Sequence, residues 1–227
     1  MRTLVLADIH GGHRALLQCF ERSSFDHEAD QLIFLGDATD VWSQSPECVA
    51  ELMKVRQLIH LIGNHDFWTM TWIAYGDKPY LWLSQGGQAT IDSYEREEWA
   101  GSWASHLDFF RRARHYYLDR EDRLFVHAGI EPGLTLKEQD DETFFWDREL
   151  FDVTTGVPGY SEVYIGHTPT ISVGVTSPLN YGGADNIWRM DTGAGWNGRL
   201  SITDVDTKEY WQSDPLPELY SDEEGRM

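Results

Sequence analysis

The sequence predicts an α/β fold in which two packed sheets are flanked by helices, and two patterns support this. Over the first 63 residues, strand-like apolar runs alternate with helix-like segments in the order βαβαβ, which implies parallel strands joined by right-handed crossovers. In the second half, antiparallel pairing is more frequent, and the last two predicted strands form a hairpin. A sandwich of two sheets accounts for both halves better than one open sheet does.

The predicted elements follow one another along the chain. Three strands and the two helices between them come first, at 3–8, 13–24, 31–37, 46–55 and 57–63. The tryptophan-rich stretch 67–122 is interpreted as a helical, cap-like insertion over the sheet edge. The remaining strands are predicted at 123–129, 161–167, 186–191, 198–206 and 207–213.

Composition and charge limit the class of protein. A chain of 227 residues with 41% hydrophobic residues is long enough for one sizeable core, so we expect a single domain over 1–227. The formal net charge of −20 should repel nucleic-acid backbones. The acidic runs at 95–98 and 139–142 are interpreted as solvated faces, and the run at 221–224 as part of a frayed acidic tail over 214–227.

The chain is expected to be a cytoplasmic protein that does not interact with membranes. The early apolar segment, residues 4–7, is too short to span a membrane or to serve as a signal sequence. Cys19 and Cys48 lie in helix-like patterns without metal-type spacing, so a reducing compartment fits and no disulfide is needed. The sequence gives no indication of an oligomeric state.

Polar side chains with metal-binding chemistry follow five of the predicted strands. They occur in the segments DIH at 8–10, GDATD at 36–40, GNHD at 63–66, VHAG at 126–129 and GHT at 166–168. Parallel neighbouring strands bring such ends to one rim, where open α/β sheets bind ligands. Each segment alone is weak evidence, because Gly followed by Asp is also ordinary turn chemistry.

Together, in this order, the five segments resemble the motif series of the calcineurin-like metallophosphoesterases. The resemblance runs from about residue 2 to residue 204 and is greatest to the bacterial serine/threonine protein phosphatase branch, which the segments at 82–87, 144–150 and 190–201 also resemble. It implies a four-layer α-β-β-α sandwich of two mixed sheets, with the helical excursion placed after GNHD.

The resemblance also implies a two-metal site. Asp8, His10 and Asp37 would hold one ion, while Asp37, as the shared ligand, would hold the second together with Asn64, His127 and His167. Carboxylate, imidazole and amide ligands suit manganese, the expected metal, and also iron, zinc or nickel. Two such ions clamp a phosphate and present a bridging hydroxide in line with the scissile bond.

Two further residues are expected to handle the leaving group. By the same resemblance, His65 would protonate the leaving oxygen, and Asp40 would orient and stabilise that histidine. Asp66 is instead expected to bind backbone near the GNHD turn, so it is not counted as catalytic.

The chain departs from the branch at one position. These phosphatases usually carry a phosphate-gripping arginine directly after the second aspartate of GD-x-x-D, and Val41 occupies this position here. Phosphate binding should therefore be weaker or supplied elsewhere. Arg148, in FFWDREL, is the expected phosphate clamp, with a surface ion pair as the alternative. For Trp42, shaping the rim and simple packing are both open.

The resemblance implies a dimetal phosphoester hydrolase, with a serine/threonine phosphatase-like phosphomonoesterase as the first hypothesis. Its substrate would be a phosphorylated protein or a small phosphoester. The alternative is hydrolysis of dinucleoside polyphosphates or of phosphodiesters, with cap tryptophans stacking a base; tryptophans at helical spacing are more often core. A non-catalytic interaction module would be expected to lose ligands, and none of the six is lost.

Overall fold

A computed structural model describes residues 1–226, so Met227, the last residue of the predicted tail, lies outside the description. The first sheet has the strand order β3-β2-β1-β8-β9. Its strands are β1 Thr3–Leu6, β2 Gln31–Phe34, β3 Gln57–His60, β8 Ser201–Asp204 and β9 Tyr210–Gln212. The first three run parallel, and β8 joins them antiparallel to β1. The predicted hairpin is confirmed, because β8 and β9 pair antiparallel.

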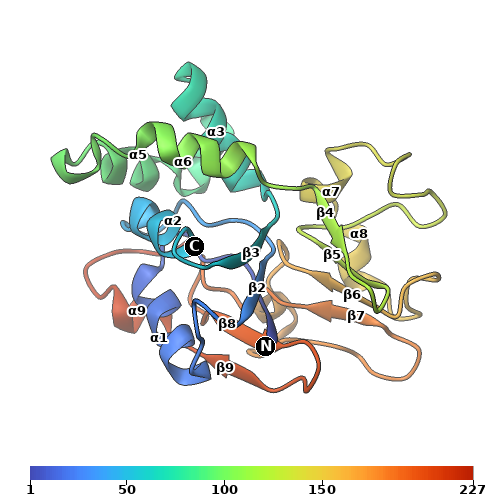
Figure 1. Ribbon diagram of the computed structural model, residues 1–227. Coiled ribbons are helices and arrows are strands. Elements are labelled where there is room, and N and C mark those ends of the chain that lie inside the picture. Colours follow the sequence, from blue (N-terminus) through green and yellow to red (C-terminus); the bar gives the residue numbers. More distant parts are fainter. Residues whose placement is uncertain (227) are drawn as a thin grey trace.

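The second sheet is also mixed and has the strand order β4-β5-β6-β7. Its strands are β4 Tyr116–Leu118, β5 Arg123–Val126, β6 Glu162–Ile165 and β7 Ile187–Arg189. The last three are parallel, and β4 is antiparallel to β5. The two sheets pack face to face around a shared apolar layer that includes Val5, Ile33, Phe125 and Tyr164, all fully buried. This is the predicted sandwich (Figure 1).

Helices cover the outer faces of both sheets, as their apolar stripes require. The first sheet is covered by α1 His13–Ser23, α2 Ser45–Leu52 and α9 Leu216–Leu219. The second is covered by α7 Thr143–Trp146 and α8 Glu149–Asp152. Figure 1 shows the first group on one side of the molecule and the second group on the other.

A helical cap follows β3 and lies beyond the sheets at the top of Figure 1. It consists of α3 Asn64–Tyr75, α4 Tyr80–Trp82, a kinked π-helical turn Leu83–Gly87, α5 Gln88–Tyr94, the 3₁₀ turn Glu97–Trp99 and α6 Trp103–Arg111. The predicted helical stretch 67–122 is wrong at its C-terminal end, where residues 116–118 form β4. That strand has only three residues and is fixed by its pairing with β5, which local sequence does not reveal.

Three of the five tryptophans of the cap form a separate small core, while Trp99 and Trp103 are partly exposed. Trp68, Trp72 and Trp82 are buried together with Ile91 and Tyr94. The ring centroids of Trp72 and Trp82 are 5.9 Å apart, a distance typical of packed aromatic pairs. These tryptophans are therefore core residues of the cap, as their helical spacing favours.

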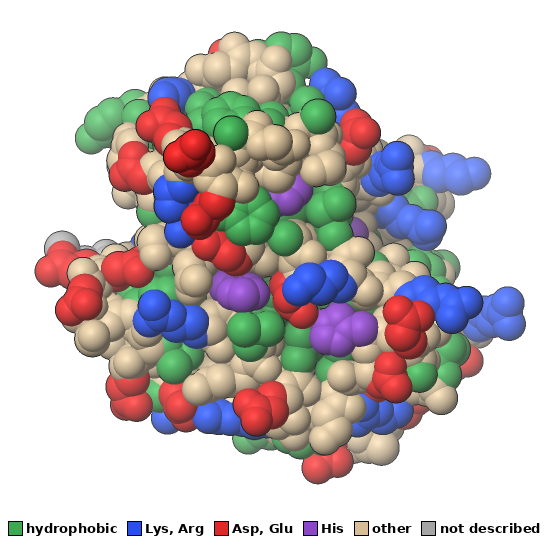
Figure 2. Space-filling model, turned by 60° about the vertical axis from the view of Figure 1, so that its left-hand side comes forward, with side chains coloured by type: hydrophobic (Ala, Val, Ile, Leu, Met, Phe, Trp, Pro, Cys, Tyr) green, Lys and Arg blue, Asp and Glu red, His purple; other side chains and the backbone are tan. Residues whose placement is uncertain are grey.

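The acidic surface is dispersed. On the face shown in Figure 2, acidic and basic side chains are interspersed, with small hydrophobic patches between them. The interpretation of 221–224 as part of a frayed tail is wrong for Glu223, because its carboxylate accepts hydrogen bonds from the amide and the hydroxyl of Ser43, at 2.9 and 2.7 Å.

Candidate active site

The site forms where strands of both sheets end, and it is built from unusual backbone turns. Within residues 1–226, nine non-glycine residues have positive φ, and six of them lie at this rim: Asp8, His10, Asp37, Asp40, Val41 and His167. Such conformations cost about 1–3 kcal/mol each and persist only when the surroundings impose them, typically at functional sites. Their concentration at these strand ends marks this rim as the functional part of the fold.

Two glycines allow the second and third strand ends to meet. Gly36 has φ +106°, and a Cβ there would lie 2.4 Å from the backbone nitrogen of Gly63. A Cβ on Gly63 would lie 2.1 Å from an oxygen of Asp37. The two motifs GD and GN therefore need glycine because their backbones touch.

Asp66 holds this junction together. One carboxylate oxygen accepts the amide of Asp37 and the other accepts the amide of Ala38, both at 2.8 Å. The amide of Gly63, at the start of α3, also donates to this side chain at 3.3 Å. The prediction that Asp66 binds backbone near the GNHD turn is confirmed.

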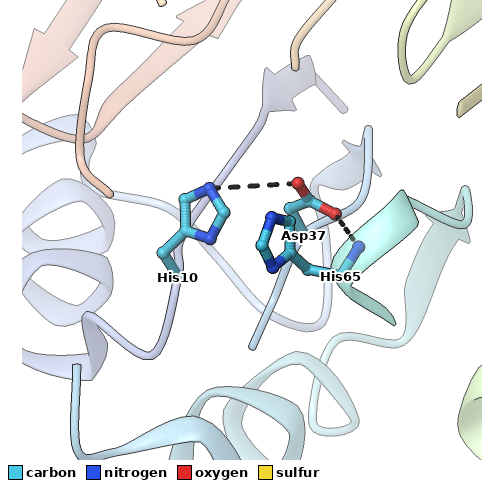
Figure 3. Close-up of side chains that lie close together, drawn as sticks. All are labelled: His10, Asp37 and His65. Atoms are coloured by element: carbon cyan, nitrogen blue, oxygen red, sulfur yellow. Dashed lines mark hydrogen bonds and ion pairs between the residues drawn. The ribbon is translucent and has the colours of Figure 1, made fainter. Parts of the chain in front are cut away.

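Asp37 lies at the centre of the cluster (Figure 3). Its Oδ2 lies 3.4 Å from Nε2 of His127 and 3.9 Å from Nε2 of His10. Its Oδ1 accepts the backbone amide of His65 at 2.9 Å. Possible ligand atoms group as His10, Asp37 and His65, and as Asp37, His127 and His167, each set lying within 4.8 Å. Both groups share Asp37.

The histidine rings are oriented as metal ligands usually are. Nδ1 of His127 donates to the carbonyl of Leu35 at 2.9 Å, and Nδ1 of His10 donates to that of Thr39 at 3.1 Å. A backbone partner on one nitrogen leaves Nε2 of a neutral ring as the free electron pair. Burial lowers the pKa of His127 to about 4, so its ring is neutral at ordinary pH.

Two further contacts fit a cation at this place. Nε2 of neutral His127 faces Oδ1 of Asn64 at 3.2 Å, so two acceptors point at each other. Nε2 of His167 is buried and finds no hydrogen-bond partner within residues 1–226. Buried polar atoms are normally paired. A divalent cation accepts electron pairs from all three groups, so the residues fit the implied metal.

Asp8 lies next to the same cluster. Its carboxylate accepts the backbone amide of His167 at 3.0 Å, which links the first strand end to the second sheet. Burial, together with the nearby carboxylates of Asp191 and Asp37, raises the pKa of Asp8 well above its usual range. Several buried carboxylates this close together require positive charge in order to stay ionised.

Asp191 is a site residue that sequence reasoning missed. It lies two residues after the end of β7, is buried, and accepts the amide of Gly193 at 2.8 Å. Burial raises its pKa to about 6. The signal was present in the MDTGAGW segment, which follows a strand as the other motifs do.

Asp40 and His65 form a buried hydrogen-bonded pair, with 2.5 Å between Oδ2 and Nδ1. Oδ2 also accepts the indole N–H of Trp82, and Oδ1 accepts the hydroxyl of Thr90, both at 2.7 Å. Burial raises the pKa of Asp40 to about 7, while these two donors oppose the rise. Nδ1 of His65 is thus tied to Asp40, which leaves Nε2 for contact with other groups.

Comparison with known proteins decides the family. The sequence profile described as "Calcineurin-like phosphoesterase" matches residues 1–205, which is most of the chain. The chain belongs to the calcineurin-like phosphoesterase family. It is therefore a metal-dependent phosphoesterase, and the metal-ligating groups around Asp37 accord with the two-metal chemistry of that family.

Relatives of this phosphoesterase carry two different names. "Serine/threonine-protein phosphatase 1" of Salmonella typhimurium (strain LT2) is 26% identical over 88% of this chain and 90% of its own length. "Bis(5'-nucleosyl)-tetraphosphatase, symmetrical" of Coxiella burnetii (strain Dugway 5J108-111) is 29% identical over 60% of this chain, but over only 44% of its own length. The tetraphosphatase of Pseudomonas fluorescens (strain SBW25) is 22% identical, over 96% of this chain and 97% of its own.

Solved structures agree on the fold. A putative diadenosine tetraphosphatase superposes with a TM-score of 0.69 at 16% identity, covering 94% of this chain and 93% of its own. A serine/threonine phosphatase from Saccharomyces cerevisiae gives a TM-score of 0.59 at 14% identity, covering 94% and 79%. At these identities the likeness establishes the architecture of the phosphoesterase and leaves its substrate open.

Arg148 lies at the rim of the phosphoesterase site. Its Nη1 donates to the hydroxyl of Thr168 at 3.1 Å, directly after His167, and its side chain is exposed. Within residues 1–226, Arg148 forms no ion pair of the kind considered as the alternative. The phosphate-clamp role stays a prediction.

Val41 and Trp42 face the protein interior. Val41, at the position of the family arginine, is buried with 8% exposure, and Trp42 is fully buried. The indole N–H of Trp42 donates to the carbonyl of Ala194 at 2.8 Å. Of the two roles open for Trp42, the structure supports packing.

Across residues 1–226 no helix is long and apolar enough to cross a membrane.

Proposed function

We propose that this phosphoesterase is a serine/threonine protein phosphatase-like phosphomonoesterase. The observation that carries the proposal is the Asp40–His65 pair beside Asp37: a hydrogen-bonded histidine adjoins a group of metal-ligating side chains. A phosphomonoester needs both, because its charge must be neutralised and its leaving oxygen must be protonated.

The metal roles form part of the proposal. Asp8, His10 and Asp37 would hold one divalent ion, and Asp37, Asn64, His127 and His167 the other, with manganese as the expected metal. The group of mutually close ligand atoms around His10 contains His65 in place of Asp8, and in this proposal His65 serves the leaving group instead. When bound, the ions would neutralise phosphoryl oxygens and activate the attacking water. The left-handed turns at Asp8, His10 and Asp37 hold the ligands in place before substrate arrives.

His65 supplies the proton in this scheme. With Nδ1 on Asp40, Nε2 is the atom that delivers a proton to the leaving oxygen. The Asp40 carboxylate stabilises the protonated ring, and Trp82 and Thr90 keep that carboxylate in position. Arg148, beside His167, would bind phosphoryl oxygens from the rim.

Two observations favour a phosphomonoester over a dinucleotide. The cap tryptophans Trp68, Trp72 and Trp82 are buried in their own core, so they offer no face to a base. The Salmonella protein phosphatase also matches over nearly its whole length, whereas the Coxiella tetraphosphatase matches over less than half.

Dinucleoside polyphosphate hydrolysis is the second candidate. Tyr75 and Tyr80, at the outer end of the cap, are 76% and 85% exposed, and exposed aromatic rings can stack bases. The Pseudomonas relative, named as a tetraphosphatase, also spans nearly the whole chain.

A substrate panel separates the candidates. The protein loaded with Mn²⁺ would be assayed on p-nitrophenyl phosphate, phosphoserine and phosphothreonine peptides, and diadenosine tetraphosphate. The proposal expects the highest kcat/KM on a monoester, and no turnover after EDTA treatment. Preference for diadenosine tetraphosphate would favour the second candidate, while full turnover with no metal detected by elemental analysis would exclude the metal roles.

A cytoplasmic location is also proposed, since Cys19 and Cys48 are both buried, unpaired thiols in the described part of the chain. Cell fractionation with an antibody to the protein would test it.

A further inference from the structure

The segment after α9 returns to the active site. The ring of Tyr220 stacks on Trp42, with centroids 5.1 Å apart, and its hydroxyl donates to Oε1 of Gln44 at 2.7 Å. Glu223 then binds Ser43 through two hydrogen bonds. Successive residues after Val41 thus hold this segment, which turns back toward the centre of the molecule in Figure 1.

The segment places Arg226 at the catalytic histidine. The amide of Arg226 donates to the carbonyl of Gly195 at 3.2 Å, and its Nε donates to the carbonyl of Gln85 at 3.1 Å. Its Nη2 lies 2.5 Å from Nε2 of His65, the nitrogen that Asp40 leaves unused. The guanidinium is therefore held by backbone on one side and points into the site with the other.

The charge around Arg226 is strongly negative. Burial has the largest effect and lowers the pKa of Arg226, while the carboxylates of Asp37, Asp40, Asp191 and Asp8, in that order, favour its positive charge. Of the arginines in the described chain, this one contacts the proposed general acid, whereas Arg148 contacts Thr168 at the rim.

The anchor of Arg226 lies next to the residue that replaced the family arginine. The amide of Val41 donates to the carbonyl of Gly86 at 3.2 Å, and the preceding residue, Gln85, accepts Nε of Arg226. Val41, which stands where the family has an arginine, and the guanidinium of Arg226 are thus bound to two consecutive residues of one turn, Gly86 and Gln85.

We propose that Arg226 is a phosphate-binding residue of this enzyme and takes over the role for which Val41 is unsuited. With substrate present, Nη2 releases Nε2 of His65 and donates to a phosphoryl oxygen, while Nε stays on Gln85. A guanidinium suits this role because its fork of donors matches phosphate geometry. The inference rests on the proposed function only in requiring a phosphoryl group beside His65.

The C-terminal segment could instead be an inhibitory tail that blocks the site, but this role accounts less well for the contacts of Tyr220 and Glu223. The anchors at Tyr220 and Glu223 bind Trp42, Gln44 and Ser43, and none of these is a proposed ligand or the general acid. Substrate can therefore enter when the end of one side chain moves, without release of the segment.

Binding of inorganic phosphate to the Mn²⁺-loaded protein, measured by isothermal titration calorimetry, tests the proposal independently of the substrate. Arg226→Gln should weaken phosphate binding roughly tenfold. Arg226→Lys should fall between this variant and the parent, because it keeps charge but loses the fork. Arg56→Gln, at an exposed arginine remote from the site, is the matched control and should change nothing. Unfolding midpoints verify that all variants are folded.

Three results would overturn the proposal. They are an unchanged phosphate Kd in Arg226→Gln, the same Kd change in the Arg56→Gln control, or tighter phosphate binding with a raised kcat, which would identify the segment as an inhibitory tail. If Arg226→Gln does not fold, Ser43→Ala serves instead: it removes one contact to Glu223, keeps the guanidinium, and should weaken phosphate binding a few-fold. An unchanged Kd in that variant would equally contradict the proposal. Phosphate binding with no turnover of monoesters would contradict the proposed function alone.

Discussion

Trp82, in the helical cap, donates its indole N–H to Oδ2 of Asp40, in the loop that follows β2, over 2.7 Å. The same oxygen lies 2.5 Å from Nδ1 of His65, so the cap contributes a donor to the proposed catalytic pair in addition to covering the site. A cap residue of this kind links packing to chemistry, because moving the cap changes how well Asp40 is held.

Trp82→Phe should keep most of the packing and remove one donor from a buried carboxylate. A hydrogen bond to a charged group is worth about 1.5–3 kcal/mol, so kcat should fall roughly tenfold or more. That bond opposes the rise of the Asp40 pKa to about 7, so without it the pKa rises further and the acid limb of kcat moves to higher pH. A kcat profile measured on phenyl phosphate checks this. Trp72→Phe, which alters the adjacent ring, should leave the limb in place.

His65→Asn tests proton delivery to the leaving group. The variant should lose much more kcat on phenyl phosphate, a poor leaving group, than on p-nitrophenyl phosphate, whose phenolate leaves without help. Elemental analysis should find its metal content unchanged. Equal losses on both substrates would argue that His65 acts by another route.

Mn²⁺ affinity should depend on pH through the carboxylates and not through the histidines. Burial raises the pKa of Asp8 and Asp37 well above the usual range, and lowers that of His127 to about 4. Because the pKa values of these carboxyls are raised, protons compete with the ion at low pH, while His127 remains neutral; affinity should therefore be lower at pH 5.5 than at pH 8. Calorimetric titrations at several pH values measure this fall.

A variant that neutralises a neighbouring carboxylate provides the control for that experiment. The Asp191 carboxylate contributes to the raised pKa of Asp8, so Asp191→Asn should lower that pKa and move the loss of affinity to lower pH. The same Kd at pH 8 and pH 5.5 in the parent protein would contradict the assignment of these carboxylates as ligands.

Asp66→Ala should destabilise the protein and loosen its metal site together. It leaves the amides of Asp37 and Ala38 without their acceptor, at a cost of about 2–3 kcal/mol in the free energy of unfolding. Urea unfolding with EDTA present measures the stability alone, and Mn²⁺ titration measures the site. Asp77→Ala, in an exposed loop, should be neutral in both assays.

Val41→Arg should not restore phosphate binding. The side chain of Val41 belongs to the apolar cluster between the first sheet and its helices, where an unpaired guanidinium costs about 3 kcal/mol or more. The variant should unfold at lower urea concentration and bind phosphate no more tightly. Val173→Arg, at a half-exposed site, is the control for adding an arginine. A stable variant with a tenfold lower KM would show that position 41 can reach the phosphate.

Much of the architecture follows from local sequence. The strands that end at Asp8 and Asp37 are short apolar runs followed by polar turns, and both the run and the turn can be recognised within ten residues. Strand β4 could not be predicted. It consists of only two tyrosines and a leucine, and these residues form a strand because they pair with β5.

The missed site residues share one feature. Trp82, Asp191 and Arg226 reach the site from segments far from the motifs they support. Arg226 also follows an acidic run that is typical of a solvated tail, and its docking depends on Trp42 and Ser43, whose side chains carry no motif of their own. The contact of Arg226 is a property of the folded chain and not of any window of sequence, whereas Asp191 could have been found because it follows a strand as the other motif residues do.

The left-handed turns at the strand ends decide how this site can be engineered. Asp8, His10, Asp37, Asp40 and His167 all have positive φ, which a regular strand or helix does not offer to a side chain. Grafting the same side chains onto a scaffold with ordinary backbone would aim them in other directions. A designed site would have to include the loops as whole units. It would also need the glycines that let these loops touch and Asp66, whose carboxylate binds the amide of Asp37.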